Sequence, residues 1–361
     1  MRTSIQNYVI NQMRILVFSE NFFPDMGGLE RNTFTLASTL SELGHEVTVL
    51  TGTLKTDDEI YPFKVVRSKS QSTYWAVIKE TDLIFINGGI ALKVCLAALV
   101  LRKKYLPIYI MYNTYLSEKQ GFVANLNRVL REYLASKAKL NITLSQYTKE
   151  LLQSLSPKHA VEILLNPIDG ELERIAAQKN GMVKHKIHDL LFAGRMIEGK
   201  GIFILIDAIA ELKSVRNLKV AFAGEGDDKD ALLAYAKEKN VDIAYLGRLN
   251  NEQIIEAYLQ SKVLVVPSST HKEGNPLVIA EAISLGLPII ASDQPPMIEA
   301  VGNAGYIFKS GRADDLAQKI MQLFNGDNLQ DKTKETQVRK QEFSYAKYKT
   351  TLNNILLKAA T

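Results

Sequence analysis

The chain has 361 residues, a length that suits two domains of medium size. It is 46% hydrophobic and 23% charged, which is the balance of a soluble globular protein and excludes an intrinsically disordered one. The single cysteine, Cys95, excludes an internal disulfide and fits a reducing compartment, and the five histidines lack the spacing of a zinc site.

The net charge is +5 at pH 7 and is unevenly distributed. Residues 1–166 hold 19 lysines and arginines against 14 acids, whereas residues 167–361 hold 25 of each, so we expect an anionic partner for the N-terminal half. The longest apolar stretch, residues 90–101, is shorter than the roughly 20 residues that span a bilayer, and no hydrophobic signal segment begins the chain. We therefore expect a cytoplasmic protein.

Short apolar runs alternate with helix-length periodic stretches from Met13, which is an alternative natural start to Met1. The runs predict strands at residues 15–19, 47–51, 83–87, 107–111, 140–144 and 161–165. Amphipathic patterns predict helices over residues 30–44 and 122–138. Strands that are apolar throughout and alternate with helices indicate a parallel sheet covered on both faces.

The pattern restarts after a polar segment that contains no strand. The second series predicts strands at residues 189–194, 219–224, 243–247, 263–267 and 288–292, and helices at 202–213, 229–240 and 251–260. The sequence therefore predicts an α/β protein with two doubly wound domains. We expect an N-terminal domain over residues 1–166, a linker over 167–188, a C-terminal domain over 189–342, and a final amphipathic helix over 343–361.

Ligands of doubly wound sheets bind at the carboxyl ends of the strands, so the loops there are the first place to look. Gly27 and Gly28 lie between the first strand and the first helix, where glycine lets the backbone approach an anion at a helix N-terminus. A tight turn explains them equally well, and the G-x-G-x-x-G dinucleotide pattern is absent.

Two cations, Arg195 and Lys200, follow the first strand of the second domain in "FAGRMIEGKG". Arginine binds phosphate bidentately and lysine supplies a compact charge, so the pair suits a diphosphate. The alternative is two solvated surface cations.

The segment "PSSTHKEGNPLVIAEAISLGLP", residues 267–288, carries two acids, Glu273 and Glu281. Asn275 is expected to cap the following helix, with Pro276 at its first position. Glu281 falls inside an apolar helix and needs a partner, because a buried carboxylate is costly unless it is paired. Arg195, Lys200 or ligand hydroxyls are the expected partners, and a purely structural ion pair is the alternative.

These motifs resemble those of the family-4 retaining glycosyltransferases of the GT-B fold, in which two Rossmann-like domains face each other across a cleft. The resemblance runs from "ILVFSENFFPDMGGLER" through "ILLNPID", "LLFAGRMIEGKG", "FAGEGDD" and "YLGRLNNEQIIEAY" to "EGNPLVIAEA". It implies a nucleotide-diphosphate sugar as co-substrate, no other cofactor, and no metal. Fixed cations and helix dipoles would stabilise the departing diphosphate.

The resemblance also implies roles for individual residues. Arg195, Lys200 and Glu273 would be catalytic, with Glu273 on the hydroxyls of the transferred sugar and Glu281 on the ribose. The expected donor-binding set is Gly27, Gly28, Gly194, Arg248, Leu249, His271, Gly274, Asn275, Leu277, Val278 and Glu281.

Two features depart from the family pattern or compete with it. Many relatives carry a histidine near the reacting sugar, whereas this chain has Asn113 and Thr114 there, which we expect on the acceptor side. Asp228 and Asp230 form an Asp-x-Asp sequence that binds metal in a different fold, but at the start of a helix we interpret them as capping residues.

Residues 102–139 hold eight cations against two acids, and part of this segment is amphipathic. Such a face could rest on anionic lipid, which suits a lipid-linked acceptor, or it could be a solvated helix face. The pattern does not favour nucleic acid.

The sequence thus predicts a retaining, metal-independent glycosyltransferase of the hexosyl type that acts on a glycan or a lipid-linked acceptor in polysaccharide or glycoconjugate biosynthesis. We expect it in the cytoplasm, either free or peripheral at the inner face of a membrane. A nucleotide-sugar epimerase or a phosphorylase on the same scaffold is one alternative. A non-catalytic protein that binds sugar nucleotides is another.

Overall fold

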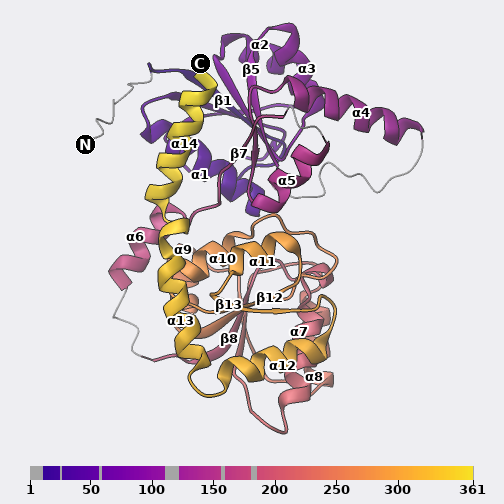
Figure 1. Ribbon diagram of the computed structural model, residues 1–361, viewed down its shortest axis with the longest axis vertical. Coiled ribbons are helices and arrows are strands. Elements are labelled where there is room, and N and C mark those ends of the chain that lie inside the picture. The colour runs from indigo at the N-terminus through magenta and orange to yellow at the C-terminus, as the bar shows by residue number, and fades with distance from the viewer. Residues whose placement is uncertain are drawn as a thin grey trace.

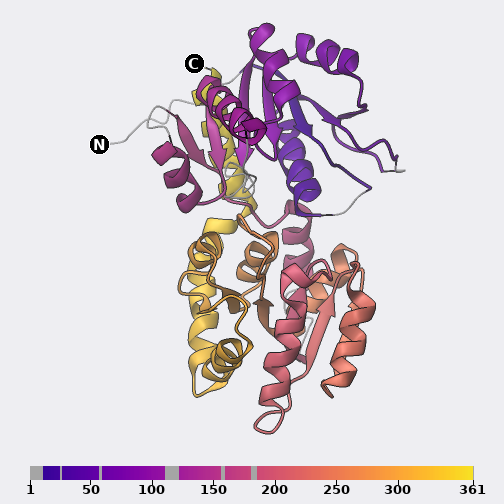
Figure 2. The same cartoon turned by 90° about the vertical axis from the view of Figure 1, so that its right-hand side faces the viewer.

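The computed structural model describes residues 11–24, 27–56, 59–109, 122–155, 159–179 and 185–360. Two parallel sheets lie one above the other along the long axis of the molecule (Figures 1 and 2). The α/β fold class expected from the alternating pattern is confirmed.

The first sheet has seven strands in the order β3-β2-β1-β4-β5-β6-β7. They are β1 (Arg14–Ser19), β2 (Glu46–Thr51), β3 (Lys64–Arg67), β4 (Leu83–Asn87), β5 (Lys104–Tyr109), β6 (Asn141–Thr143) and β7 (Val161–Ile163). Strands β1 and β4 are the central pair, in register from Ile15 opposite Leu83 to Ser19 opposite Asn87. Buried β-branched and leucine side chains fill both faces of this pair, as a doubly covered parallel sheet requires.

The second sheet has six strands in the order β10-β9-β8-β11-β12-β13, so β8 occupies the place that β1 has in the first sheet. They are β8 (His188–Ala193), β9 (Val220–Ala223), β10 (Ile243–Gly247), β11 (Ser261–Val266), β12 (Ile289–Ser292) and β13 (Gly305–Phe308). The edge strands β3 and β13 were not among the expected strands.

Helices cover both faces of each sheet. The first sheet carries α1 (Gly28–Glu42), α2 (Gln71–Glu80), α3 (Leu92–Val100), α4 (Phe122–Lys137) and α5 (Gln146–Leu155). The second carries α7 (Ile202–Leu212), α8 (Lys229–Glu238), α9 (Asn251–Leu259), α10 (Leu277–Ser284), α11 (Pro295–Val301) and α12 (Ala313–Phe324). Each sheet therefore lies between two apolar cores.

Two segments connect the sheets. Helix α6 (Gly170–Lys179) follows β7 and packs against α9 through Leu172, Ile175 and Ile255. At the other end, α13 (Asn328–Arg339) and the short η2 (Lys340–Phe343) lead into α14 (Tyr345–Ala360). Leu352 and Leu356 of α14 are buried in the core beside the first sheet, so the chain crosses back to the N-terminal domain, as Figure 1 shows in yellow.

Within the described part of the chain, no helix combines the length and the apolar character needed to cross a bilayer. Cys95 is buried in the core of the first domain, and burial raises the pKa of its thiol to about 12.

Candidate functional site

The turn between β8 and α7 carries both expected cations. After Gly194, at φ +155°, the chain presents Arg195 and then forms the short 3₁₀ turn η1 (Glu198–Lys200). Gly201 closes this turn at φ +76°, and a Cβ there would lie 1.9 Å from the carbonyl oxygen of Pro267. Only glycine tolerates both the left-handed conformation and this approach, so Gly201 seats Lys200 against the loop that follows β11.

The neighbouring loop after β9 supports the same turn. A Cβ on Gly224 would lie 2.0 Å from the carbonyl oxygen of Gly194, so the two backbones are in close contact. Asp228 is the N-cap residue of α8 and Asp230 lies in its first turn, as expected, but the Asp228 side chain makes no hydrogen bond to the helix and instead accepts one from the amide of Glu198 at 2.6 Å. No group of three or more potential metal ligands occurs among the described residues.

Lys200 and Glu273 form the central ion pair of the site. The Nζ of Lys200 lies 2.5 Å from Oε1 of Glu273, and the hydroxyl of Ser268 donates to the same oxygen at 2.7 Å. The backbone amide of Glu273 donates to Oε1 of Gln294 at 2.9 Å, while Nε2 of Gln294 donates to the carbonyl oxygens of Ser268 and His271. The loop after β11 is therefore fixed around a carboxylate that is only 6% exposed.

His271 brings the remaining cation into the cluster. Burial lowers the pKa of its imidazole, the positive charges of Lys200 and Arg195 lower it further, and Glu273 partly opposes them. Arg195 is exposed, and its side chain makes no hydrogen bond or ion pair with the residues that the structure describes. The four side chains form one cluster at the carboxyl ends of β8 and β11, where doubly wound sheets bind ligands.

The start of α10 differs from the expectation. The helix begins at Leu277 with Pro276 as its N-cap residue, so Asn275 is not the cap. The Nδ2 of Asn275 instead donates to the carbonyl oxygen of Leu144 in the other domain at 3.1 Å. This tertiary hydrogen bond takes the place of the expected cap on α10. The first turn of α10, with Leu277 and Val278, has no side-chain cap from the described residues. Its amide groups therefore remain suited to an anion.

Glu281 is buried in α10, as expected, but its partners are not the expected ones. The hydroxyl of Tyr258 donates to Oε2 at 2.7 Å, and Nη1 of Arg31 lies 3.2 Å from Oε1. Arg31 belongs to α1, so this ion pair joins the two domains. Neither Arg195 nor Lys200 contacts Glu281 within the described structure.

The remaining expected donor residues occupy different surroundings. Gly27 is the N-cap residue of α1 in an extended conformation, and a Cβ on Gly28 would meet no atom of the described residues within 4 Å. Gly274 is buried beside Glu273. Arg248 and Leu249 follow β10, with Arg248 exposed and Leu249 packed against a core of the second domain. Asn113 and Thr114 lie outside the described residues.

Sequence reasoning did not single out Arg31, Tyr258, Ser268 or Gln294. Arg31 stands in the quoted "GGLER" motif, and a cation next to that glycine pair was the available signal. Tyr258 and Ser268 also stand in quoted segments, but nothing in their spacing marked them, and Gln294 lies outside every quoted motif.

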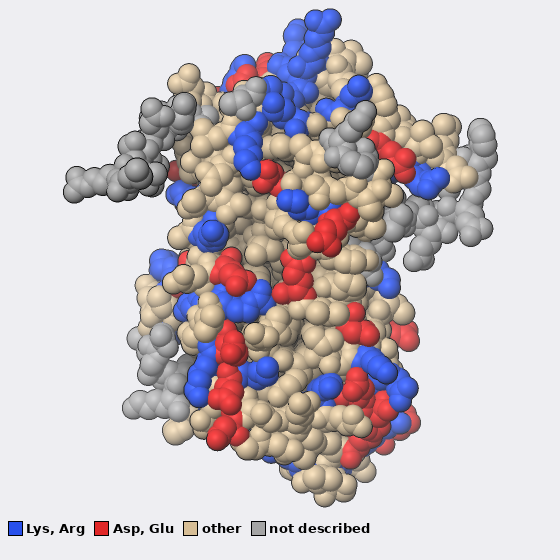
Figure 3. Space-filling view, in the orientation of Figure 1, with Lys and Arg blue, Asp and Glu red and all other residues tan. Residues whose placement is uncertain are grey.

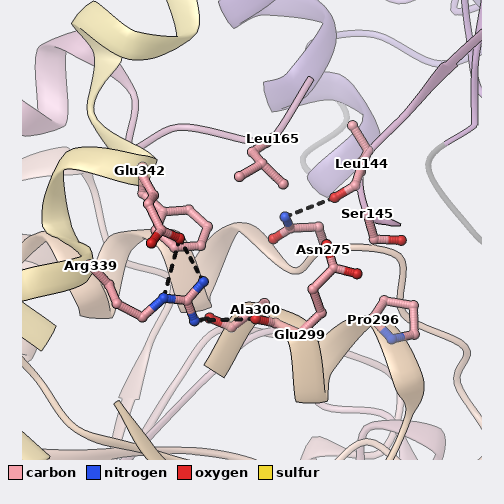
Figure 4. A pocket seen from close by; sticks show the side chains of 10 residues that line it. Leu144, Ser145, Leu165, Asn275, Pro296, Glu299, Ala300, Arg339 and Glu342 are labelled. Carbon is pink, nitrogen blue, oxygen red and sulfur yellow. Dashed lines mark hydrogen bonds and ion pairs between the residues drawn. The ribbon is translucent and has the colours of Figure 1, made fainter. Parts of the chain in front are cut away.

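A small cavity lies at the junction of the domains (Figure 4). Its lining includes Ser145 of the first domain, Asn275 and Glu299 of the second, and Arg339 near the end of α13. Beside it, the carboxylate of Glu299 accepts hydrogen bonds from the amides of residues 146 and 147, at 2.7 and 3.1 Å, at the start of α5. The junction is thus held by polar contacts on this side as well.

The expected basic face of residues 102–139 divides into parts with different surroundings. Lys104 donates to the carbonyl oxygens of Ala359 and Ala360 at the end of α14, and Arg131 donates to that of Ile90. Other cations remain on the outside, and Figure 3 shows Lys and Arg gathered over the end of the N-terminal domain that faces away from the second domain.

Comparison with known families matches both halves of the chain. The profile described as "Glycosyltransferase Family 4" covers residues 26–172, and the profile described as "Glycosyl transferases group 1" covers residues 174–340. Together they cover every strand of the two sheets except β1, and the loops that carry the candidate site.

Individual relatives agree with these profiles. The chain is 25% identical over 328 residues to alpha-monoglucosyldiacylglycerol synthase of Acholeplasma laidlawii, which covers 77% of this chain and 80% of that protein. It is 39% identical over 138 residues to N-acetylgalactosamine-N,N'-diacetylbacillosaminyl-diphospho-undecaprenol 4-alpha-N-acetylgalactosaminyltransferase of Campylobacter jejuni, or 37% of this chain and 36% of that protein.

Solved structures share the arrangement of the two domains. Anabaena HepE, determined in complex with UDP and glucose, superposes with a TM-score of 0.77 at 19% identity, covering 96% of this chain and 99% of that one. At this identity the likeness establishes the fold. With the two profiles, it shows that the chain belongs to the family-4 glycosyltransferases of the GT-B fold and is a glycosyltransferase.

Proposed function

We propose that this glycosyltransferase transfers a sugar from a nucleoside diphosphate sugar to a lipid-linked acceptor, with retention of anomeric configuration and without a metal ion. The observation that carries the proposal is the cluster of Arg195, Lys200, His271 and Glu273 beside the uncapped start of α10. This cluster holds both the positive charge that a diphosphate needs and a fixed acceptor for sugar hydroxyls.

The leaving group defines the role of the cations. When the bond between sugar and phosphate breaks, negative charge grows on the diphosphate, and positively charged groups already in place lower the barrier. Arg195 has no partner in the described structure and is free to bind, and Lys200 adds a second charge nearby. The amides in the first turn of α10 can contribute the helix dipole. These groups supply the electrostatic stabilisation for which other enzymes use a metal ion.

Glu273 suits the sugar. Its contacts with Lys200 and Ser268 both reach Oε1, and Oε2 takes no hydrogen bond from the described residues. A carboxylate oxygen in this state is a strong acceptor for a sugar hydroxyl. Lys200 contacts this acid and would also bind the diphosphate, so one side chain would align the sugar with its leaving group.

Retention is supported by the nature of the relatives and by the electrostatics. The two named relatives carry "alpha" linkages in their names. Attack from the face of the departing phosphate would let that phosphate accept the proton of the acceptor hydroxyl, so a protein nucleophile is unnecessary. Burial and the two cations lower the pKa of His271, so its imidazole is neutral at pH 7 and can donate a hydrogen bond without carrying a positive charge.

A stripe on α4 supports an acceptor held in a membrane. Leu126, Val129 and Tyr133, at helical spacings of three and four, are 59%, 56% and 52% exposed. Arg128 is exposed next to this stripe, and Nζ of Lys137 lies 5.4 Å from the ring centroid of Tyr133. An apolar stripe edged by cations binds the anionic inner leaflet of a membrane. The names of both relatives also include a lipid, diacylglycerol in one and undecaprenol in the other.

The transfer is tested by incubating the protein with UDP-, GDP- and ADP-sugars and an extract of polar lipids, with and without a chelator. We expect one donor to release its nucleoside diphosphate and to label a lipid, equally in both conditions, with an alpha linkage by NMR. The proposal would be contradicted by a reaction that the chelator inhibits, by a beta linkage in the product, or by hydrolysis of the donor to free sugar without labelling of any lipid.

The membrane contact is tested separately by flotation with two kinds of vesicle. One contains phosphatidylcholine alone, and in the other about one lipid in three is phosphatidylglycerol, which gives the surface a negative potential. We expect flotation with the anionic vesicles only, and its loss in the double variant Leu126→Ser/Val129→Ser. Leu233→Ser is the matched control, because Leu233 is an exposed leucine on α8 of the second domain. Equal flotation of both variants would contradict the contact.

A further inference from the structure

Arg31 reaches from the N-terminal domain into the second one. It lies in the first turn of α1, and its Nη1 is 3.2 Å from Oε1 of Glu281 while its Nη2 donates to Oδ1 of Asn251 at 3.2 Å. The guanidinium thus spans two separate acceptors in the opposite domain. Its side chain is 29% exposed, whereas that of Glu281 is 4% exposed. The Arg31 side chain is therefore partly accessible to solvent, and the buried carboxylate has Arg31 as its charged partner.

The second oxygen of Glu281 is fixed within its own domain. Oε2 accepts the hydroxyl of Tyr258, which is fully buried. Burial and the neighbouring carboxylate raise the pKa of Tyr258 well above its usual value, so this hydroxyl remains a donor at any neutral pH. One oxygen of the acid is therefore held from within its own domain, and the other is held by a residue that belongs to the opposite domain.

The neighbours of Arg31 tie the same helix turn to the connecting segment. Nδ2 of Asn32 donates to Oδ1 of Asn166 at 2.6 Å, and Nδ2 of Asn166 donates to the carbonyl oxygen of Asn275 at 2.7 Å. Asn251, the second acceptor of Arg31, itself donates to Glu171 of α6 at 3.0 Å. The start of α1, the linker and the approach to α10 are therefore joined by polar contacts beside Glu281.

We propose that Arg31 is a positioning residue for the nucleotide: from the opposite domain it holds the Glu281 carboxylate in the orientation that receives the ribose, so that nucleotide affinity depends on contact between the domains. This inference rests on the proposed function, because it takes Glu281 as the ribose contact. Arg31 acts through Glu281 and needs no contact with the reacting atoms.

The arrangement predicts a specific kinetic signature. An interaction that orients the nucleotide equally in the ground state and the transition state changes KM and leaves kcat in place. Arg31→Ala should therefore raise the KM for the donor about tenfold, in line with the loss of one hydrogen bond to a charged group, with little change in kcat. Arg31→Lys should recover part of the loss. Its single ammonium group can pair with Glu281, but it lacks the second nitrogen with which arginine also contacts Asn251.

The test is a double-mutant cycle on nucleotide binding. Calorimetry with UDP and with GDP as probes compares the wild type, Arg31→Ala, Glu281→Gln and the double variant, with thermal unfolding to establish that each is folded. We expect Arg31→Ala to weaken binding about tenfold in the wild-type background and to have no further effect once Glu281 is Gln. Arg14→Ala is the control, because Arg14 pairs with Asp82 at 2.9 Å on the surface of the same domain.

Each outcome decides the inference. Additive losses, an unchanged affinity in Arg31→Ala, or a fall in kcat with an unchanged KM would overturn the positioning role while leaving the proposed function intact. If the wild type binds neither UDP nor GDP and also fails with ADP, both the inference and the proposed function fail. Partial recovery in Arg31→Lys supports the inference, and full recovery contradicts the need for two acceptors.

Discussion

The turn after β1 and the turn after β8 occupy the same place in their two sheets but are built differently. After β1 the chain offers Gly28, around which there is open space, and Arg31, which reaches across to the other domain. After β8 it offers Arg195 and Lys200 on a turn whose closing residue, Gly201, is pressed against a neighbouring backbone. One topology thus produces an open turn and a packed turn. The fold determines where a ligand binds, and the residues of each turn determine which charge it meets.

The close packing of the turn after β8 can be tested by adding a methyl group to its closing glycine. In Gly201→Ala the new Cβ meets the Pro267 carbonyl at 1.9 Å and the backbone is left-handed, so we expect a loss of about 3 kcal/mol or more in the free energy of unfolding of the second domain. Gly311→Ala is the matched control, with φ +80° and no atom within 4 Å of its Cβ. It should cost only about 1–2 kcal/mol, the price of the left-handed conformation. Denaturant unfolding measures both, and equal losses would contradict the close packing.

Removing the charge of the packed turn tests its chemistry. Lys200→Met keeps the length of the side chain but removes the cation that pairs with Glu273, so we expect kcat to fall by roughly 10²–10³-fold, as for other electrostatic groups of this kind. Lys334→Met, which removes an exposed cation paired with Asp331 on α13, should leave kcat unchanged. A steady-state assay of nucleoside diphosphate release measures both. A kcat within a factor of about three of wild type in Lys200→Met, no larger than the usual context effects, would remove Lys200 from the leaving-group site.

The open turn should respond in the opposite manner. In Gly28→Ala the methyl group enters empty space at the first position of α1, so we expect the free energy of unfolding to change by less than about 0.5 kcal/mol. If the diphosphate approaches this turn closely, the same methyl group should raise the donor KM about tenfold, roughly 1.4 kcal/mol of lost binding. An unchanged KM would show that α1 stays away from the donor.

The smallest expected effect concerns protons. The pKa of His271 is lowered in the free protein by burial and by two cations, so the imidazole is neutral above about pH 6.5 and becomes charged only at lower pH. A bound diphosphate adds negative charge and favours the charged form, so binding of UDP near pH 6 should take up a fraction of a proton that His271→Gln does not take up. Calorimetry in two buffers of different ionisation enthalpy measures this difference. It should vanish at pH 8, where neither state is protonated, and a difference that persists there would assign the uptake to another group.

The apolar runs in the sequence predicted most strands, because strands covered on both faces carry continuous hydrophobic sequences. The two missed strands lie at the sheet edges, where this signal weakens. β3 reads Lys64–Arg67, with a cation at each end, and β13 begins at Gly305, whose Cβ would lie 1.7 Å from the carbonyl oxygen of Ile289. Glycine lowers the strand signal at the place where close backbone contact requires it.

Part of the site could be predicted because its residues follow the predicted strands of one domain, even where they are 73 residues apart. Lys200 and Glu273 follow adjacent strands, and the sheet order brings them together. The partner of Glu281 was not predictable in the same way, since Arg31 lies 250 residues away in another domain. Asn275 illustrates the same limit, because a hydrogen bond to Leu144 across the junction outweighs its local preference for capping a helix.

The most direct measurement of the central claim is a crystal structure with a bound nucleoside diphosphate, chosen from UDP, GDP and ADP by affinity. We expect its diphosphate oxygens at about 3 Å from the side chains of Arg195 and Lys200 and from the first amide groups of α10. The proposed site would be contradicted by a diphosphate bound elsewhere, with Arg195 still exposed to solvent and Lys200 still in contact with Glu273 only.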